Sequence, residues 1–283
     1  MKHIKRAYLF LIFGILYVPI LTLILFSFNS TNSTAEFTGF SFYWYKELFS
    51  NRGEAVTALC NSLILAVLSA LLSTLIGTAA AEGIYRMRSK LLKTTVNSVT
   101  NIPMMNPDIV TAMAMMLFFT AVMGIFKIGD YNDFGFIAML IAHTTFCLPY
   151  VILSVLPRIN ELGDSLSEAA LDLGCTPLQA FFKVKLPNIM PGVISGMIMA
   201  FTLSLDDFII SSFIAPSNFQ TLPLLIYSMT KKKVRPDMYA LSTIIIVSVF
   251  LLLLLSNIRA SKDASGKRRK AGGSKKRVSG GGV

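Results

Sequence analysis

Long apolar runs alternate with short polar segments along this chain of 283 residues. A helix needs about 20 consecutive apolar residues to cross the hydrocarbon layer of a bilayer. Runs of this length occur in six places, so the pattern predicts an all-α, polytopic membrane protein with six transmembrane helices. The predicted spans are 7–28, 57–81, 107–126, 134–156, 191–214 and 238–258.

The composition and the cysteines favour the same class. Hydrophobic residues make up 54% of the chain and charged residues only 14%, which lies outside the range of ordinary soluble domains. The first run is longer than the core of a signal peptide, contains Pro19 and has no small-residue cleavage site, so we expect a retained span. Cys60, Cys147 and Cys175 are odd in number and lie in apolar or cytosol-facing contexts, so they imply no disulfide framework.

The lysines and arginines predict the orientation. Six spans put both termini on one side, and the positive-inside rule favours the cytoplasm for that side. With this orientation, the run of Lys231, Lys232, Lys233 and Arg235 lies outside and departs from the rule. The basic residues near the spans that agree with it are Lys2, Lys5, Arg6, Arg86, Arg88, Lys90, Lys93, Arg158, Lys183 and Lys185.

Two further segments differ from the spans in composition. Residues 259–283 are rich in Gly, Ser, Lys and Arg, so we expect a disordered, basic cytoplasmic tail after a transmembrane domain at 1–258. This tail either marks topology or attracts anionic lipid. In the first outside loop, "FTGFSFYWYKELF" predicts a short aromatic helix at the level of the headgroups.

The segment "SLSEAALDLGCTPLQAFFKVKLP" interrupts the apolar pattern between the fourth and fifth runs. Ser165 and Glu168 fit a capping box that begins a helix, and Gly174 is suited to end it. Thr176, Pro177 and Gln179 predict a second helix.

We expect Pro187 and Pro191 to end that second helix. The result is a helix–Gly–helix elbow at 164–187, although a plain connection between helices needs only about 2–8 residues. The elbow is either a docking element for a cytosolic partner or a hairpin that closes the helix bundle.

The elbow also matches a known pattern. The sequence Glu168-Ala169-Ala170, three residues, Gly174, nine residues, and Val184-x-Leu186-Pro187 resembles the EAA loop, E-A-A-x3-G-x9-I-x-L-P, of the ABC importer permeases. Val184 replaces the usual Ile. The stretches "ALCNSLILA", "NPDIV", "FCLPYV", "FTLSLDDFIISSFI" and "TLPLLIYSM" resemble the spermidine/putrescine branch of that family.

This resemblance implies an ABC type I importer permease fold in a bacterial cytoplasmic membrane, with no enzymatic activity. The implied partners are a second permease subunit, a cytosolic ATPase dimer that binds the ATP, and an extracytoplasmic substrate-binding protein. No cofactor, metal or nucleic acid is implied. The elbow would be the coupling helix that contacts the ATPase, through Glu168, Ala169, Ala170, Gly174, Pro177, Leu186 and Pro187. A permease for an amino acid or a metal complex is the alternative within this class, and a passive channel or membrane scaffold is the alternative outside it.

Asp206 and Asp207 are acidic residues deep inside an apolar run, where burial of a carboxylate costs at least about 2.5 kcal/mol. Neighbouring helix positions point about 100° apart, so we expect one carboxylate to line a pathway and the other to bond within the bundle. A structural pairing with a partner subunit is the alternative.

We interpret Asp108 as a first-turn charge on a helix dipole and His143 as a packing or hydrogen-bonding residue. The candidate pathway residues for a polycation are Asp206, Asp207, Ser204, Phe208, Ser211 and Tyr150.

Overall fold

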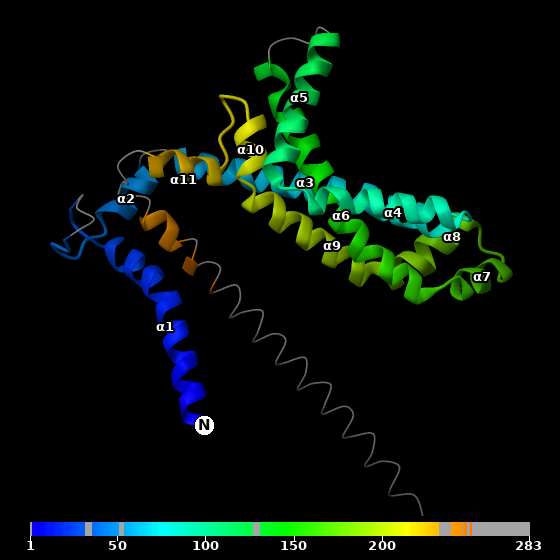
Figure 1. Ribbon diagram of the computed structural model, residues 1–283, viewed down its shortest axis with the longest axis horizontal. Helices are drawn as coiled ribbons and strands as arrows, with labels where there is room; N and C mark the ends of the chain where they lie inside the picture. The colour runs from blue at the N-terminus through cyan, green and yellow to red at the C-terminus, as the bar shows by residue number, and fades with distance from the viewer. Residues whose placement is uncertain are drawn as a thin grey trace, which may run out of the picture. The chain divides into compact units, whose positions relative to one another are not determined.

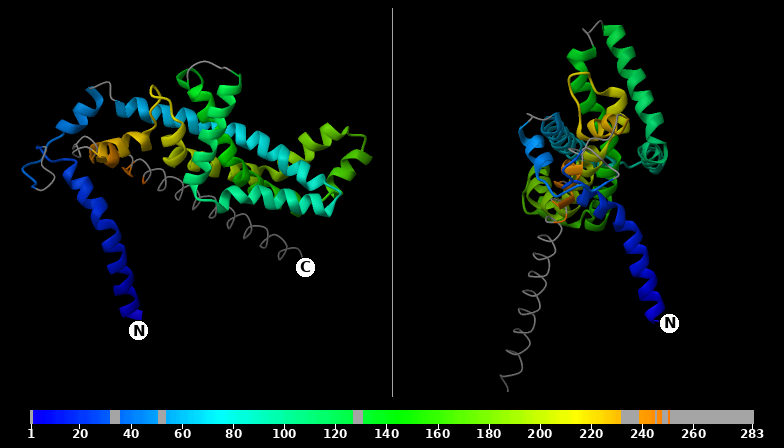
Figure 2. Two further views of the ribbon diagram at one scale, coloured as in Figure 1. Left: turned by 45° about the horizontal axis from the view of Figure 1, so that its top comes forward. Right: turned by 90° about the vertical axis from the view of Figure 1, so that its left-hand side faces the viewer.

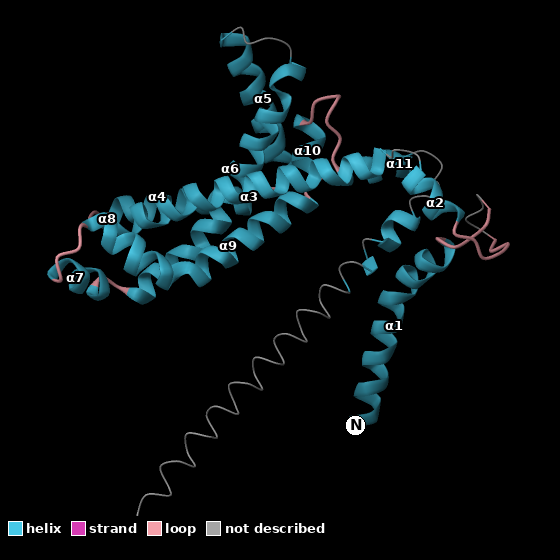
Figure 3. Cartoon of the chain, turned by 180° about the vertical axis from the view of Figure 1, so that it is seen from behind, coloured by secondary structure: helices cyan, strands magenta, loops and turns pink. Residues whose placement is uncertain are grey.

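The structure is a computed structural model that describes residues 2–31, 36–50, 54–126, 131–231, 239–244, 246–247 and 250. These residues are mostly helical, and their only β contact is an isolated bridge between Asn29 and Phe40, which confirms the all-α class (Figures 1 and 3). The chain divides into two compact units, one from 1–53 and 232–283 and the other from 54–231.

The first unit contains α1 (Lys2–Phe26) and α2 (Tyr43–Ser50). The short helix expected in the aromatic loop is therefore present as α2. Trp44 on α2 is buried, and its indole N–H donates to the backbone oxygen of Asn29 at 2.8 Å. The described residues 239–244, 246–247 and 250 are helical and belong to the sixth predicted span. The rest of that span and the tail at 259–283 lie outside the described residues.

The second unit contains the remaining helices and holds the candidate site. In Figures 1 and 2, α3, α6 and α9 run alongside one another, while α5 and the first part of α6 project from them. The bounds are α3 (Glu54–Arg86), α4 (Lys90–Met105), α5 (Asp108–Phe126), α6 (Tyr131–Leu162), α7 (Ser165–Asp172), α8 (Pro177–Ala180), the π-turn η1 (Phe181–Lys185), α9 (Leu186–Asp206), α10 (Ile209–Ile214) and α11 (Leu222–Lys231).

Five helical segments of the described residues are long and apolar enough to cross a membrane: Tyr8–Phe26, Glu54–Arg86, Asp108–Ile125, Gly135–Leu162 and Pro177–Asp206. They correspond to the first five predicted spans. The fifth differs from the prediction, because the helix begins before residue 191 and is broken at Asp207 rather than continuing to Ile214. An apolar run alone does not reveal this break.

Small residues allow α3, α6 and α9 to pack closely. Every third or fourth residue of α3 is a buried Ala, Ser, Thr or Gly over much of its length, a pattern that favours close helix contact in membranes. A Cβ on Gly77 would lie 2.7 Å from Cγ1 of Val151 on α6, and one on Gly192 of α9 would lie 2.8 Å from the backbone oxygen of Ser154. Neither position has room for a side chain.

The helix α4 was not predicted from the sequence. It is 16 residues long and mixes polar with apolar positions, and the hydroxyl of Ser89 accepts a hydrogen bond from the N–H of Leu92 at its start. It packs against α3 and α6. Its apolar stretches are too short for a span, so the pattern of long apolar runs does not reveal it.

Candidate substrate pocket and coupling elbow

The break between α9 and α10 is formed by Asp207. Its carboxylate accepts hydrogen bonds from the backbone N–H groups of Ile210, at 3.2 Å, and Ser211, at 2.8 Å, and from the Ser211 hydroxyl at 3.0 Å. The first turn of a helix has N–H groups with no partner inside the helix, and a carboxylate satisfies them well. Asp207 thus supplies the polar partners that let a new helix begin inside the apolar run.

A buried hydrogen-bond network supports this break. His143 on α6 is fully buried, and its Nδ1 lies 2.8 Å from Oγ of Ser204 while its Nε2 lies 3.2 Å from Oγ of Ser211. The hydroxyl of Ser69 on α3 donates to Ser204 at 2.8 Å. Because Ser211 donates to Asp207, it can accept from Nε2–H, which favours the neutral Nε2–H tautomer with Nδ1 as acceptor. The network therefore links α3, α6, α9 and α10.

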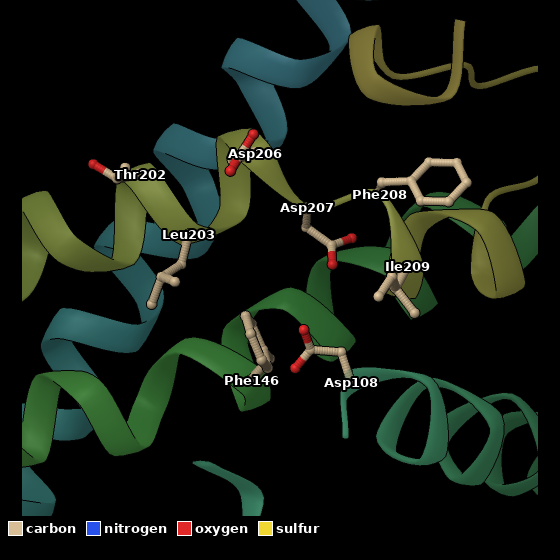
Figure 4. A pocket seen from close by; sticks show the side chains of 8 residues that line it. All are labelled: Asp108, Phe146, Thr202, Leu203, Asp206, Asp207, Phe208 and Ile209. Carbon is tan, nitrogen blue, oxygen red and sulfur yellow. The ribbon is translucent and has the colours of Figure 1, made fainter. Parts of the chain in front are cut away.

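A pocket of about 370 Å³ opens beside the break. Three of its lining residues carry carboxylates: Asp108 at the start of α5, and Asp206 and Asp207 (Figure 4). The other lining residues are apolar, aromatic or hydroxyl-bearing: Phe146, Thr202, Leu203, Phe208 and Ile209. No basic side chain is among these lining residues, so this pocket suits a positively charged ligand.

The two neighbouring aspartates differ in their surroundings. The side chain of Asp207 is 7% exposed and bonds within the bundle. Asp206 is exposed, and no hydrogen bond or ion pair joins it to another residue in the part of the chain that the structure describes. Within this subunit, Asp206 is therefore the more available carboxylate for a ligand.

The other predicted pathway residues fall in three places. Phe208 lines the pocket, whereas Ser204 and Ser211 are buried in the His143 network. Tyr150 is not among the lining residues. Its ring lies 5.8 Å from the ring of Phe146, which does line the pocket. Sequence reasoning missed Asp108 as a pocket residue, because its position at a helix start had a sufficient explanation in the helix dipole. Only the packing of α5 against α10 brings it near Asp207.

The aromatic rings of Phe208 and Tyr227 lie between the pocket and Lys231. The ring of Phe208 lies 4.4 Å from that of Tyr227 on α11, and Nζ of Lys231 lies 4.6 Å from the centroid of the Tyr227 ring. Lys231 thus contacts an aromatic face that extends beyond the lining residues. Lys232, Lys233 and Arg235 lie outside the described residues.

The first arm of the elbow is α7, and its start differs from the prediction. Its N-cap residue is Asp164, with no hydrogen bond from a capping side chain, so the capping box predicted for Ser165 and Glu168 is wrong. The helix begins one residue too early for Ser165 to occupy the cap position. Ala170 is buried, and the acidic Glu168 lies in the first turn, where it suits the helix dipole.

The end of α7 confirms the prediction for Gly174. Gly174 has φ +87°, in the left-handed region that favours glycine. Its N–H donates to the backbone oxygen of Leu171 at 2.9 Å, and the N–H of Cys175 donates to that of Ala170 at 3.0 Å. These are the two bonds of a Schellman motif, which ends the helix and turns the chain.

The second arm begins as predicted but does not end as predicted. Thr176 and Gln179 form a capping box, and Pro177 is the first helical residue. The helix then continues through η1 into α9, so the expectation that Pro187 and Pro191 end it is wrong. Pro187 directly follows η1, in the first turn of α9, and Pro191 is accommodated within the helix. The elbow is therefore continuous with the fifth span.

The elbow also presents exposed apolar side chains. Leu173, between the two arms, is 87% exposed, Leu178 on α8 is 71% exposed and Phe182 in η1 is 60% exposed. Ala170 and Ala180, by contrast, are buried against the rest of the unit. One side of the elbow is thus packed, and the other is free to contact another protein in a subunit assembly.

Comparison with known proteins places this chain in a family. Residues 73–261 match the family described as "Binding-protein-dependent transport system inner membrane component". The chain belongs to this family. It is a multi-pass inner-membrane permease component of a binding-protein-dependent transport system. This confirms the class of protein inferred from the EAA pattern.

Individual relatives of the permease extend over most of its length. It is 37% identical to the spermidine/putrescine transport system permease protein PotC of Haemophilus influenzae over 260 residues, covering 92% of this chain and 97% of that protein. The corresponding Escherichia coli K12 protein is 36% identical over 265 residues, covering 94% and 97%. The putrescine transport system permease protein PotI of Escherichia coli K12 is 39% identical over 238 residues, covering 84% and 83%.

A solved structure supports the fold of the permease. A crystal structure of a bacterial ABC transporter involved in the import of the acidic polysaccharide alginate aligns with a TM-score of 0.69 and 18% identity, covering 90% of this chain and 95% of that chain. The fold is therefore that of an ABC importer permease, as the sequence predicted.

Proposed function

We propose that this permease carries polyamines, spermidine or putrescine, across the membrane as one subunit of an ATP-driven importer. The single observation that carries the proposal is the pocket at the α9 break, where three carboxylates and no basic side chain line the same space. Polyamines are flexible polycations, which such a pocket would bind by charge-assisted hydrogen bonds. The names of the PotC and PotI relatives support this substrate class.

Within the pocket, the residues would have different roles. Asp206 and Asp108, both exposed, would pair with the ammonium groups of the substrate. The rings of Phe146 and Phe208 would contact its cationic and methylene groups through cation–π and apolar contacts. Asp207 would keep the helix break in place rather than leave its bonds to Ser211, and so would shape the pocket.

The elbow would couple the permease to ATP. Its exposed Leu173, Leu178 and Phe182 would be seated in a groove of a cytosolic ATPase subunit, as an amphipathic helix is seated in a partner. Because the elbow continues into α9, which ends at the pocket, movement of the elbow would reach the pocket along one helix. Glu168, Ala169, Ala170, Gly174, Pro177, Leu186 and Pro187 would shape this element.

The rest of the assembly follows from this arrangement. A second permease subunit would complete the pathway, a substrate-binding protein would deliver polyamine from outside, and ATP would bind only to the ATPase subunits. Transport would proceed by alternating access, with closure of the ATPase dimer opening the pathway outward. The elbow lies at the end of α3 that carries Arg86, followed by Arg88 and Lys90, so the positive-inside rule supports a cytoplasmic elbow and cytoplasmic termini.

The experiment is uptake of labelled spermidine into vesicles that contain the permease with its second permease subunit, ATPase and binding protein. We expect saturable uptake that requires ATP and is reduced by unlabelled putrescine, but not by amino acids or by a chelated metal. Uptake without ATP would instead favour a passive channel. ATP hydrolysis that responds to an amino acid and not to spermidine would reject the polyamine assignment and retain the importer class.

A further inference from the structure

Lys185 is the only lysine or arginine that is buried among the residues that the structure describes. It lies in η1, within the coupling elbow, and its side chain is 3% exposed. Its Nζ lies 2.9 Å from each carboxylate oxygen of Glu82 on α3, which is 103 residues away in the sequence. Lysine is rarely buried unless it is paired. This ion pair therefore joins the elbow to α3.

The surroundings of the pair are asymmetric. On the protein side, Nζ of Lys185 also lies 4.5 Å from the centroid of the Tyr85 ring, a cation–π distance. On the solvent side, Nε of Arg86 lies 2.6 Å from Oε1 of Glu82, but the Arg86 side chain is 63% exposed. Glu82 thus has one buried and one exposed cation, and only the buried one belongs to the elbow.

The π-turn explains how a lysine of the elbow comes to point inward. In an α-helix, residues five positions apart point about 140° apart. In a π-turn, whose bonds run from residue i to i+5, such residues lie nearly above one another. Ala180 and Lys185 are both buried, and the N–H of Leu186 bonds to the backbone oxygen of Phe181. The wider turn therefore directs Lys185 toward α3 while Ala180 stays packed.

Among the described residues, two polar links join α3 to the elbow and the helix that leaves it. Near the pocket, the Ser69 hydroxyl donates to Ser204 on α9. Near the elbow, Lys185 bonds to Glu82. Between these links, the buried face of α3 consists largely of small side chains, which could slide past a neighbour more easily than charged groups could separate.

We propose that the Lys185–Glu82 pair transmits movement of the elbow to α3, so that α3 and α9 move together when a partner displaces the elbow. This inference rests on the proposed coupling function. The connection from the elbow to α9 is covalent, whereas its polar connection to α3 is the ion pair. Glu82 keeps Arg86 when the pair separates, but the buried Lys185 loses its only ion-pair partner among the described residues. An unpaired buried charge is costly, so the pair stays closed during the movement. Lys185 and Glu82 are positioning residues for transport.

The test compares Lys185→Met, Glu82→Gln and the charge swap Glu82→Lys with Lys185→Glu, all in the complete transporter in proteoliposomes. The matched control is Glu161→Gln, which removes an exposed ion pair to Arg158 on α6. Two quantities are measured: spermidine taken up per ATP hydrolysed, and the increase in ATP hydrolysis when binding protein is added. The second quantity does not depend on the identity of the transported solute.

We expect each single variant to retain ATP hydrolysis and to lose about tenfold in both quantities, the size of a typical coupling between sites. The swap recovers part of the loss, because the pair is restored while Arg86 then faces a cation at position 82, and the control matches the wild type. Equal coupling in all variants would overturn the proposal. Loss of the ATPase subunit from the single variants would also overturn it, because the pair would then only support assembly. If the wild type responds to binding protein without taking up spermidine, the polyamine assignment fails and the ion pair is still tested by the ATP response.

Discussion

The carboxylate of Asp207 accepts hydrogen bonds from both the backbone N–H and the hydroxyl of Ser211, at 2.8 and 3.0 Å. Because of these bonds, the neighbouring residues Asp206 and Asp207 have different roles. Asp207 maintains the break between α9 and α10, and Asp206 remains exposed at the pocket. Of two adjacent carboxylates, that of Asp207 therefore stabilises the helix break and that of Asp206 is available to a ligand.

The first prediction separates the two aspartates. Asp207→Asn removes charge-assisted hydrogen bonds from a side chain that is 7% exposed, so it should lower the free energy of unfolding by about 1–2 kcal/mol. Asp206→Asn should change it by less than about 0.5 kcal/mol, because the side chain is exposed and has no partner in the described chain. Thermal unfolding of the purified protein in detergent measures both. Equal losses of stability would contradict the assignment.

The second prediction concerns His143. His143→Ala removes a buried ring and leaves the hydroxyls of Ser204 and Ser211 without this partner, so we expect a loss of about 2–4 kcal/mol in stability. His143→Gln should lose less, since its amide can still donate to one serine and accept from the other. The melting temperatures of the two variants measure this difference. Identical values would show that the hydrogen bonds to the serines contribute nothing to stability.

The third prediction concerns the turn of the elbow. Gly174→Pro forces φ toward about −65° at a residue with φ +87° and removes the N–H that bonds to Leu171, so the end of α7 is rebuilt. We expect the protein to remain in the membrane while ATP hydrolysis no longer drives uptake. Gly83→Ala is the control, because a Cβ there meets nothing within 4 Å. Normal uptake by Gly174→Pro would remove the turn from the coupling mechanism.

The fourth prediction tests the close packing of α3 on α6. Gly77→Ala would place a Cβ 2.7 Å from Cγ1 of Val151, so it should destabilise the unit by about 1–3 kcal/mol. Adding Val151→Ala should restore part of this loss, because it removes Cγ1 and leaves only the Val151 Cβ, at 2.9 Å, in close contact. The double variant is compared with each single variant by thermal unfolding, and purely additive losses would argue against the contact.

Local features of the sequence predicted local structure well. The apolar runs located five spans, Gly174 ended α7, and Thr176 with Gln179 formed the expected capping box. Each of these depends on residues within a few positions of one another. The first capping box failed because Asp164 precedes Ser165 and occupies the cap position, a difference of one residue that the motif alone does not resolve.

Features that depend on contacts between distant segments could not be predicted in this way. Asp108 belongs to the pocket only because α5 packs on α10, and the Lys185–Glu82 pair joins residues 103 positions apart. The break at Asp207 lies inside a continuous apolar run, so hydropathy predicts a single helix there. The carboxylate that satisfies the new helix start was visible as an unusual acid, but its partners were not.

The most direct test of the central claim is the initial rate of ATP-dependent spermidine uptake by Asp206→Asn, with Glu54→Gln, an acid in the first turn of α3, as the control. If the pocket at the α9 break lies on the polyamine route, Asp206→Asn reduces uptake about tenfold or more at equal amounts of assembled transporter, and the control does not. Unchanged uptake by Asp206→Asn would contradict the account and place the route elsewhere in the permease.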